Sequence, residues 1–367
     1  MRRSTLLLSF AAAAVLAGST AGIAAEWGLK EGTPDLKSAG SLVVGPDGIL
    51  FVGDAKSAAV FAIATGDNSG KAKGVQHKID GLNGKVAAAL GTAVADVKIN
   101  DLAVNSSSGN VYVSVSQGSG ADATPAVVRA DAKGNVSKLA LEKVAFSKVA
   151  LPNPPEDKLV KRGRRSRNAR DDSITDLAYI DGRVIVSGLT SSASPSTIHE
   201  IAFPFVATDS GSSVEIYHGA HGKREDYSAI RTFVPFNING KPNLLAAYVC
   251  TPLVRFPLDS LKSGEKTRGT TVAELGNRNR PLDMIVYEKD GKDFLLLINS
   301  ARGVMKIGTE AVASADITER INGTAGQSYE TVSELKNVVQ LDRLDDGHAV
   351  VLVQTDAGQN LRTIPLP

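Results

Sequence analysis

The segment from Arg280 to Ile307 carries a pattern of three short strands that constrains the fold of the whole chain. Apolar runs at 282–287 and 293–298 flank the turn sequence Lys-Asp-Gly-Lys, and a second turn precedes a third apolar run at 304–307. Short apolar runs bounded by Asp, Gly and Asn predict antiparallel β-hairpins. Because the same pattern returns along the chain, the sequence predicts a repeat protein.

Six units share this order of strands and turns. Their first strands open at polar residues: Ser41, Asp101, Asp176, Arg231 or Thr232, Asp283 and Asn337. Some 340 residues thus divide into units of roughly 57, the size of four-stranded propeller blades with their loops. The 35 glycines and the scarcity of helical spacing agree with an all-β chain. We therefore expect a six-bladed β-propeller, with a seven-bladed ring as the alternative and an open sandwich as a more distant one.

The last unit has no obvious fourth strand, because the chain stops soon after the apolar residues 361–364. An incomplete last blade would leave an open sheet edge, which closed propellers avoid. We expect an N-terminal strand around 27–30, which contains the single tryptophan, to complete this blade and close the ring.

The first 25 residues have the composition of a secretory signal peptide. A basic start at Arg2 and Arg3 is followed by an apolar run at 6–16 and by small residues at 24–25. No later stretch approaches the 20 or so apolar residues that a membrane-spanning helix needs. The expectation is a single propeller domain over 26–367, located in the periplasm or secreted, without a membrane span.

The net charge and the single cysteine limit which partners and which covalent cross-links the chain can have. The chain has 41 basic and 39 acidic residues, so removing Arg2 and Arg3 from the net charge of +2 leaves zero. A neutral protein of this kind is not expected to bind nucleic acid. With Cys250 as the single cysteine, no intramolecular disulfide can form, and a monomer stabilised by packing is expected.

The longest irregular insertion covers residues 141–172. It contains three prolines and the basic run KRGRRSRNAR at 161–170. Prolines and clustered like charges favour an exposed, mobile loop, and a docking patch for an anionic partner is the alternative.

The polar residues that open the first strands suggest a site. First strands line the channel of a propeller, so Asp101, Asp176 and Asp283 would converge on one mouth of it. Carboxylates held together repel, and Ca²⁺ or Mg²⁺ bound by oxygen ligands would relieve that repulsion. Asn100 would complete this metal site, with Asn299 and Asn337 as further oxygen donors. The alternative is structural: each aspartate caps backbone N–H groups or meets water.

Two other groups of residues have metal-binding or redox side chains. His218 and His221 lie three residues apart, but a metal site needs a third ligand at a fixed geometry, so they are expected at the surface. Cys250 is expected to fit a turn. A copper site formed by Cys250, His221 and Met284 is the alternative.

Residues 45–63, GPDGILFVGDAKSAAVFAI, resemble the repeat of the NHL and gluconolactonase-type propellers, in which a Pro-Asp-Gly turn precedes a strand. Residues 100–104 and 281–284 are similar to the blade openings of that superfamily. The resemblance implies a six-bladed propeller, and some members are metal-dependent lactonases with a channel cation held by Glu, Asn and Asp. Asn100 matches a ligand position, whereas Leu282 stands at the expected aspartate and Asp283 lies one position away.

These observations favour an exported propeller that acts as a binding or scaffold protein through its loop-rich face. The fold supports many functions, so this assignment is an analogy at the level of fold. The alternative is a lactonase-like hydrolase in which a divalent channel cation activates water. A third hypothesis is an accessory factor for a redox enzyme, with a role for Cys250 or Met284. Whether the protein is an enzyme, and which residues would be catalytic, stays open at this point.

Overall fold

The computed structural model describes residues 22, 25–162, 165–250 and 252–367. The expected signal peptide therefore lies almost entirely outside the described residues. Among the residues that are described, no helix is both long enough and apolar enough to cross a membrane.

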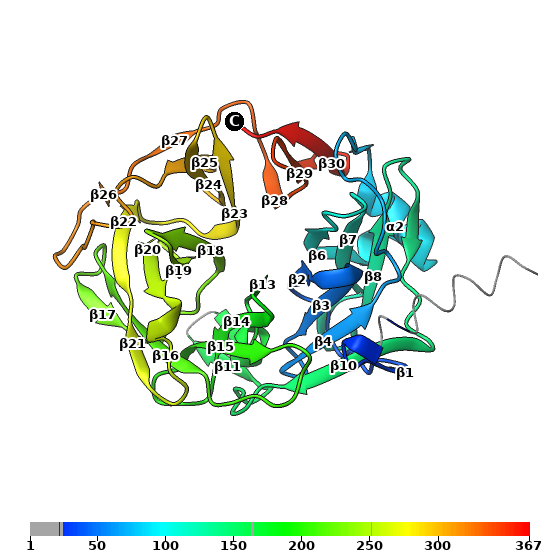
Figure 1. The fold of residues 1–367 in the computed structure, drawn as a ribbon, viewed down its shortest axis with the longest axis horizontal. Helices are drawn as coiled ribbons and strands as arrows, with labels where there is room; N and C mark the ends of the chain where they lie inside the picture. The colour runs from blue at the N-terminus through cyan, green and yellow to red at the C-terminus, as the bar shows by residue number, and fades with distance from the viewer. Residues whose placement is uncertain (1–21, 23–24, 163–164, 251) are drawn as a thin grey trace, which may run out of the picture.

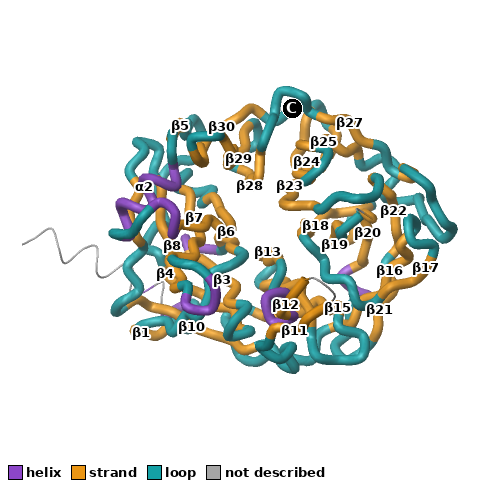
Figure 2. The backbone as a smooth tube through the Cα atoms, turned by 180° about the vertical axis from the view of Figure 1, so that it is seen from behind, coloured by secondary structure: helices purple, strands orange, loops and turns teal. Residues whose placement is uncertain are grey.

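Six antiparallel sheets surround an open centre (Figures 1 and 2), so the six-bladed β-propeller is confirmed. From the centre outward, blade 1 consists of β2 (Leu42–Val44), β3 (Ile49–Asp54), β4 (Ala59–Ala64), β10 (Val144–Ala150) and β1 (Lys30–Gly32). Blade 2 consists of β6 (Val97–Val104), β7 (Val111–Gln117), β8 (Thr124–Ala130) and β9 (Val136–Lys138). Blade 3 consists of β13 (Asp176–Ile180), β14 (Arg183–Leu189), β15 (Ser196–Ala202), β16 (Ser212–His218) and β17 (Lys223–Glu225).

The other three blades follow the same plan. Blade 4 consists of β18 (Thr232–Ile238), β19 (Lys241–Ala247), β20 (Pro252–Pro257), β22 (Thr270–Leu275) and β26 (Thr324–Gly326). Blade 5 consists of β23 (Pro281–Lys289), β24 (Lys292–Asn299), β25 (Gly303–Gly308) and β27 (Tyr329–Thr331). Blade 6 consists of β28 (Val338–Arg343), β29 (His348–Thr355), β30 (Gly358–Pro365) and β5 (Lys78–Ile79). Strand β21 (Lys266–Arg268) pairs with β16 and joins blade 4 to blade 3.

The inner hairpins form where the sequence places Asp-Gly or Asn-Gly. Asp290 and Gly291 have φ values of 52° and 71° between β23 and β24, and Asn239 and Gly240 have 52° and 76° between β18 and β19. Two consecutive left-handed residues make the tight turn whose twist matches that of the flanking strands. These turns fix the register that turns the apolar side chains of each hairpin toward the neighbouring blades.

The blades do not follow one another around the ring in chain order. The first strands contact each other in the cyclic order β2, β13, β18, β23, β28, β6 and back to β2 (Figure 1). Blade 2 therefore lies between blade 6 and blade 1. The chain leaves blade 1, pairs β5 with β30 in blade 6, and forms α2 (Leu82–Leu90) and blade 2. It then returns to blade 1 as β10.

This path corrects the expectation for ring closure. Residues 27–30 were expected to complete the last blade, but β1 pairs with β10 at the outer edge of blade 1. The strand that completes blade 6 is β5, whose Ile79 pairs with Leu361. The backbone carbonyl of His77 also accepts a hydrogen bond from the backbone N–H of Thr363 at 2.9 Å. The ring is thus closed by a segment between blades 1 and 2.

The insertion at 141–172 also differs from the expected loop. It contributes β10 to blade 1 and then forms a hairpin of β11 (Leu159–Arg162) and β12 (Arg165–Asn168). A short 3₁₀ turn, Ala169–Asp172, follows the hairpin. Arg170 donates hydrogen bonds to the carbonyl oxygens of Pro155 at 2.6 Å and Lys56 at 3.0 Å. Part of the basic run therefore fastens this hairpin to blade 1.

Apolar side chains fill the spaces between adjacent blades. Between blades 1 and 3, the fully buried Phe51 stacks on Tyr179 and meets Phe203 edge-on, and Trp27 stacks on Phe203. Aromatic pairs of this kind contribute about 1 kcal/mol beyond their burial. The Trp27 indole also donates to the Asp47 carboxylate at 2.8 Å, which holds the N-terminal segment against blade 1.

Candidate functional site

Aspartates from four first strands line the central channel. Asp101, Asp176 and Asp283 lie on β6, β13 and β23, as expected from the sequence, and Asp342 lies on β28. The first three also border a cavity of about 610 Å³ at the channel mouth, whereas Asp342 borders only the next cavity inward, of about 270 Å³. We call these four residues the channel aspartates and the larger space the mouth cavity.

Each channel aspartate bonds to the first strand of the next blade. Its Oδ2 atom accepts a hydrogen bond from a backbone N–H across the blade boundary. The pairs are Asp101 with Leu42 at 2.8 Å, Asp176 with Phe233 at 2.8 Å, Asp283 with Leu341 at 2.9 Å and Asp342 with Val104 at 2.7 Å. At the boundary between blades 1 and 3, Ser41 Oγ instead donates to the Thr175 carbonyl oxygen at 3.1 Å. Four aspartates and one serine thus connect five of the six blade boundaries.

The channel environment raises the pKa of all four carboxyl groups. Burial raises the pKa of Asp176 to about 7 and that of Asp342 to about 6. Burial and the charge of Asp176 raise the pKa of Asp101 well above its ordinary value, and burial and the charge of Asp101 do the same for Asp283. The ionised form is disfavoured because the carboxylates are removed from bulk water and repel one another.

The four residues predicted as metal ligands therefore lie in one region, in contact with protein groups. Asn100 Nδ2 donates to the Ala39 carbonyl oxygen at 2.8 Å and to Ser116 Oγ at 2.9 Å. Among the described residues, the only group of three His, Cys, Asp or Glu side chains with ligand atoms mutually within 4.8 Å is elsewhere. A divalent cation held by Asn100, Asp101, Asp176 and Asp283 stays a prediction. Asn299 and Asn337 do not border the mouth cavity.

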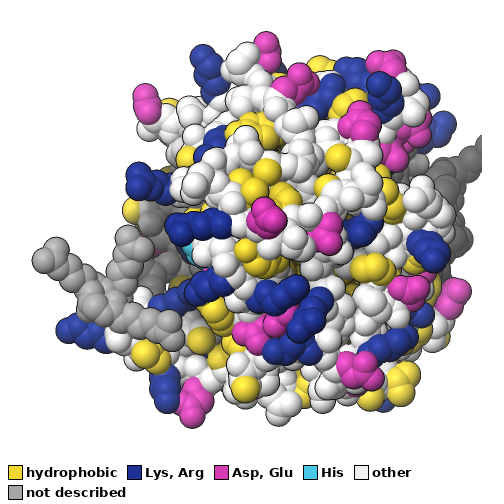
Figure 3. Space-filling model, turned by 90° about the vertical axis from the view of Figure 1, so that its left-hand side faces the viewer, with side chains coloured by type: hydrophobic (Ala, Val, Ile, Leu, Met, Phe, Trp, Pro, Cys, Tyr) yellow, Lys and Arg dark blue, Asp and Glu magenta, His cyan; other side chains and the backbone are white. Residues whose placement is uncertain are grey.

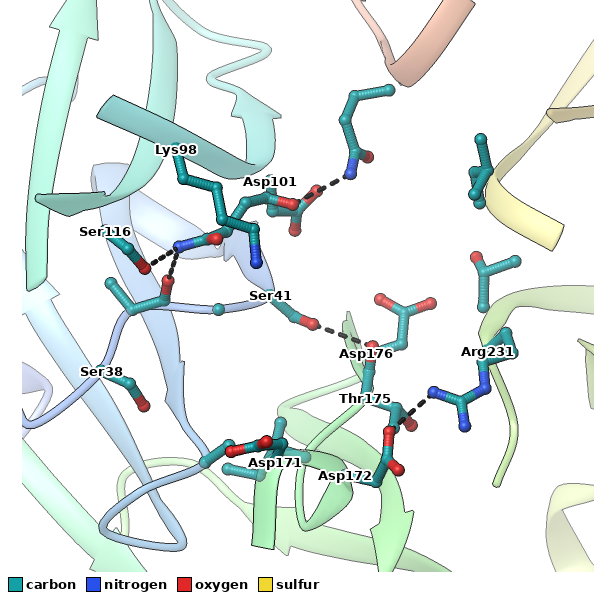
Figure 4. A pocket seen from close by; sticks show the side chains of 18 of the residues that line it. Ser38, Ser41, Lys98, Asp101, Ser116, Asp171, Asp172, Thr175, Asp176 and Arg231 are labelled. Carbon is teal, nitrogen blue, oxygen red and sulfur yellow. Dashed lines mark hydrogen bonds and ion pairs between the residues drawn. The ribbon is translucent and has the colours of Figure 1, made fainter. Parts of the chain in front are cut away.

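The mouth cavity is polar, and all six blades contribute to it (Figure 4). Hydroxyl and amide groups surround its open centre, with carboxyl groups at its inner end. The lining residues of this kind are Ser38, Ser41, Asn100, Ser116, Thr175, Thr232 and Gln340. Gln340 Nε2 donates to the Asn100 carbonyl oxygen, while its buried Oε1 has no partner among the described residues. Such a lining suits a small polar molecule rather than an apolar one.

Two arginines stand side by side on the wall formed by blades 4 and 5. Arg231 donates to Asp172 at 2.7 Å, and Arg167 of the β11–β12 hairpin bonds to the other oxygen of the same carboxylate. Arg280 has no side-chain partner among the described residues. Although its side chain is exposed to the cavity, partial desolvation and the nearby positive charge of Arg231 lower the pKa of Arg280, and the Asp172 carboxylate acts in the opposite direction. One carboxylate thus serves Arg231 and Arg167, and Arg280 remains available to a ligand.

His218, His221 and Cys250, which the sequence analysis considered separately, come together at the outer rim. His218 and His221 belong to the β16–β17 hairpin, and Cys250 to the turn between β19 and β20, where their ligand atoms lie within 4.8 Å of one another. Met284 is instead buried in the core between blades 4 and 5. The copper alternative with Met284 therefore does not match the structure.

The outer side of the ring at blades 4 and 5 shows acidic and basic side chains interspersed, with small apolar patches between them (Figure 3). This view shows no broad field of one sign.

No protein-family model matches the chain, and no curated protein matches it in sequence. Solved structures do match over much of its length. One is a PQQ-bound aldose sugar dehydrogenase from Streptomyces coelicolor. The two are 12% identical, the match covers 92% of this chain and 96% of that chain, and the TM-score is 0.35. Another is an engineered GH43 glycoside hydrolase that is 10% identical. That match covers 70% of this chain and 48% of that chain, with a TM-score of 0.37. A third is the extracellular region of plexin A4, which is 11% identical. The match covers 92% of this chain and 46% of that chain, with a TM-score of 0.43.

These three proteins differ widely in what their names describe. Similarities this low carry no argument about function, and fold alone does not specify it. The resemblance to the NHL and gluconolactonase-type repeat therefore extends only to the six-bladed propeller that the strand topology itself shows. The function of this chain must be argued from its own side chains.

Proposed function

We propose that the protein is an exported binding protein that takes a small, hydroxyl-rich anion, such as a sugar acid, into the mouth cavity. The observation that carries this proposal is the pairing of Arg231 and Arg280 on one wall, with a single buried carboxylate, Asp172, between Arg231 and Arg167. A ligand carboxylate beside Arg280 would add a second negative charge to a wall where three arginines share the Asp172 carboxylate. Arginine favours such contacts because its planar guanidinium matches a carboxylate with two donors.

The rest of the cavity fits the hydroxyl groups of the same ligand. Serine, threonine and amide side chains donate and accept hydrogen bonds in several directions, as polyhydroxylated molecules require. Because the pKa of Asp176 is raised to about 7, part of this carboxyl group is protonated at neutral pH and can also donate a hydrogen bond. A partly protonated inner end repels an anion less than fully ionised carboxylates would. A volume of about 610 Å³ lies within the range of small-molecule pockets.

The expected result for Arg280→Gln is a loss of affinity of about tenfold or more for glucuronate or gluconate. A hydrogen bond to a charged partner contributes about 1.5–3 kcal/mol, which corresponds to that loss. Titration calorimetry with glucuronate, gluconate, glucose and inorganic phosphate measures the selectivity. Arg278→Gln is the matched control, because Arg278 is exposed, lies two residues away and does not border the cavity.

Two outcomes would contradict the proposal. One is binding of glucose as tight as that of glucuronate, because the arginine wall would then have no role. The other is equal affinity in Arg280→Gln and wild type. Since Arg280 is exposed and has no side-chain partner among the described residues, its replacement is not expected to affect folding.

Export is part of the proposal and rests on the basic and apolar pattern of residues 1–25. A chain that is exported and processed should begin at Glu26. N-terminal sequencing of the protein recovered from the extracytoplasmic fraction checks this. An intact Met1 in the mature protein would contradict it.

A further inference from the structure

Two loops, one of blade 3 and one of blade 4, bring together nitrogen and sulfur side chains at the outer rim. His218 ends β16, His221 lies in the turn that follows, and Cys250 lies between β19 and β20. Each offers one ligand atom within 4.8 Å of the other two. The two imidazole rings have their centroids 3.8 Å apart. This group is distinct from the mouth cavity, whose lining includes none of the three residues.

One buried carboxylate orients both imidazole rings. Glu225, on β17, is 3% exposed. Its Oε2 lies 3.0 Å from His218 Nδ1, and its Oε1 lies 2.7 Å from His221 Nδ1. Each Nδ1 therefore carries the proton, and each Nε2 is left as an unprotonated acceptor. A carboxylate that receives the second ring N–H is the usual support of a metal-binding histidine, because it fixes the ring and raises its basicity.

Two buried polar atoms beside these rings have no partner among the described residues. His218 is 3% exposed, and its Nε2 atom is one of them. The other is Oε2 of Glu274, a fully buried residue on β22 whose Oε1 accepts the Gly219 N–H at 2.6 Å. Burying such atoms without partners costs free energy. A bound cation would give His218 Nε2 a direct partner, and its positive charge would stabilise the nearby Glu274 carboxylate.

We propose that His218, His221 and Cys250 bind a zinc ion through the two Nε2 atoms and Sγ. Nitrogen and thiolate ligands suit Zn²⁺, whereas Ca²⁺ and Mg²⁺ prefer oxygen. Binding converts the Cys250 thiol to a thiolate and releases its proton to solvent. The two positive charges of the ion are then balanced by the thiolate and Glu225. The fourth position remains for water or an incoming ligand.

The placement of the ligands gives the ion two consequences. His218 and His221 belong to blade 3 and Cys250 to blade 4, so the metal would cross-link two blades. The His221 side chain is 46% exposed, which gives the ion a route from solvent. Zinc is therefore expected to raise the melting temperature of the full chain.

Metal titration of the full mature chain, first stripped with a chelator, tests this inference. We expect one Zn²⁺ or Co²⁺ per chain, with the cobalt form showing the thiolate-to-metal absorption of a cysteine ligand. Cys250→Ser should remove that absorption, since the chain has no other cysteine. His221→Ala should lower the affinity at least tenfold. Glu225→Gln, which leaves the three ligands in place but removes the charge of the carboxylate behind the rings, should lower it about 10- to 100-fold.

His348→Ala is the matched control, because His348 also bonds to a carboxylate, Asp345, at 2.9 Å, but lies outside the rim group. Its metal affinity should equal that of the wild type. The proposal would be overturned by the absence of stoichiometric metal in the wild type, or by an unchanged cobalt spectrum in Cys250→Ser. His221→Ala removes an exposed side chain, so a folded variant is available even if Glu225→Gln misfolds.

Discussion

Replacing Gly188 with alanine is expected to lower the free energy of unfolding by about 3 kcal/mol and to weaken anion binding together with it. Gly188 lies on β14, and an added Cβ would overlap the carbonyl group of Ser173. It would also approach the Asp172 carbonyl oxygen at 3.2 Å. Both obstacles are backbone atoms, so the segment at 172–173 must move away from the sheet.

This displacement connects stability with the proposed function. Asp172 holds Arg231 in the wall of the mouth cavity, so moving its backbone also moves the guanidinium. Denaturant unfolding and glucuronate titration measure the two effects. Gly84→Ala, in α2, is the control with the opposite sign: its added Cβ meets nothing within 4 Å, and alanine in a helix should add about 0.5–1 kcal/mol. A fully stable Gly188→Ala would show that the packing of β14 against residues 172–173 is looser than the structure indicates.

The repeat pattern and the channel aspartates could be predicted from sequence because both are local signals. Apolar runs with Asp-Gly turns specify hairpins, and Asp101, Asp176 and Asp283 each directly precede an apolar residue of a first strand, although β6 begins at Val97 rather than at Asp101. Asp342 was missed because Arg343 follows it and because Asn337 occupied the expected position. The backbone N–H that donates a hydrogen bond to each aspartate belongs to another blade, and no local sequence pattern indicates which N–H this is.

The order of the blades could not be predicted, because strand periodicity does not encode which blades are neighbours. The closing strand β5 has two residues, too few for a periodic signal, and β10 lay in a segment dominated by prolines and arginines. The rim group was missed for a related reason. Cys250 is 29 residues beyond His221, and blade packing alone brings their side chains together.

The free energy of unfolding of the wild type, measured relative to that of Asp176→Asn, is expected to fall by about 2 kcal/mol as the pH rises from 5 to 8. The pKa of Asp176 is about 7 in the folded protein and about 3.9 when unfolded, so the folded state holds a proton that the unfolded state has released. That contribution is complete below the unfolded pKa and is lost as the pH rises through 7. Between pH 5 and pH 7 the folded state holds about one more proton than the unfolded state, and these two pH units correspond to about 2.7 kcal/mol. The partial exposure of Asp176 to the channel reduces the effect.

Comparing the wild type with Asp176→Asn removes the contribution of other groups that titrate in the same pH range. His77 and His199 have lowered pKa values because they are buried, so they make the folded state less stable as the pH falls below 6.5. They are present in both proteins and drop out of the difference. Urea unfolding at pH 5, 6.5 and 8 in the presence of EDTA measures the remaining slope. A difference that does not change with pH would contradict a raised pKa at Asp176.

The same measurement with excess Ca²⁺ in place of EDTA separates the two roles proposed for the channel aspartates. A cation held by Asn100, Asp101, Asp176 and Asp283 would favour the ionised carboxylates and depress their pKa values, so the relative stability of the wild type would rise with pH. The melting temperature would then depend on the Ca²⁺ concentration, and Asp176→Asn would abolish that dependence. Without a cation, the slope keeps its sign in Ca²⁺, and the carboxyl groups act by joining each blade to the next. Because the rim group offers nitrogen and sulfur, a response to Zn²⁺ alone would locate the metal there and leave the channel free for an organic anion.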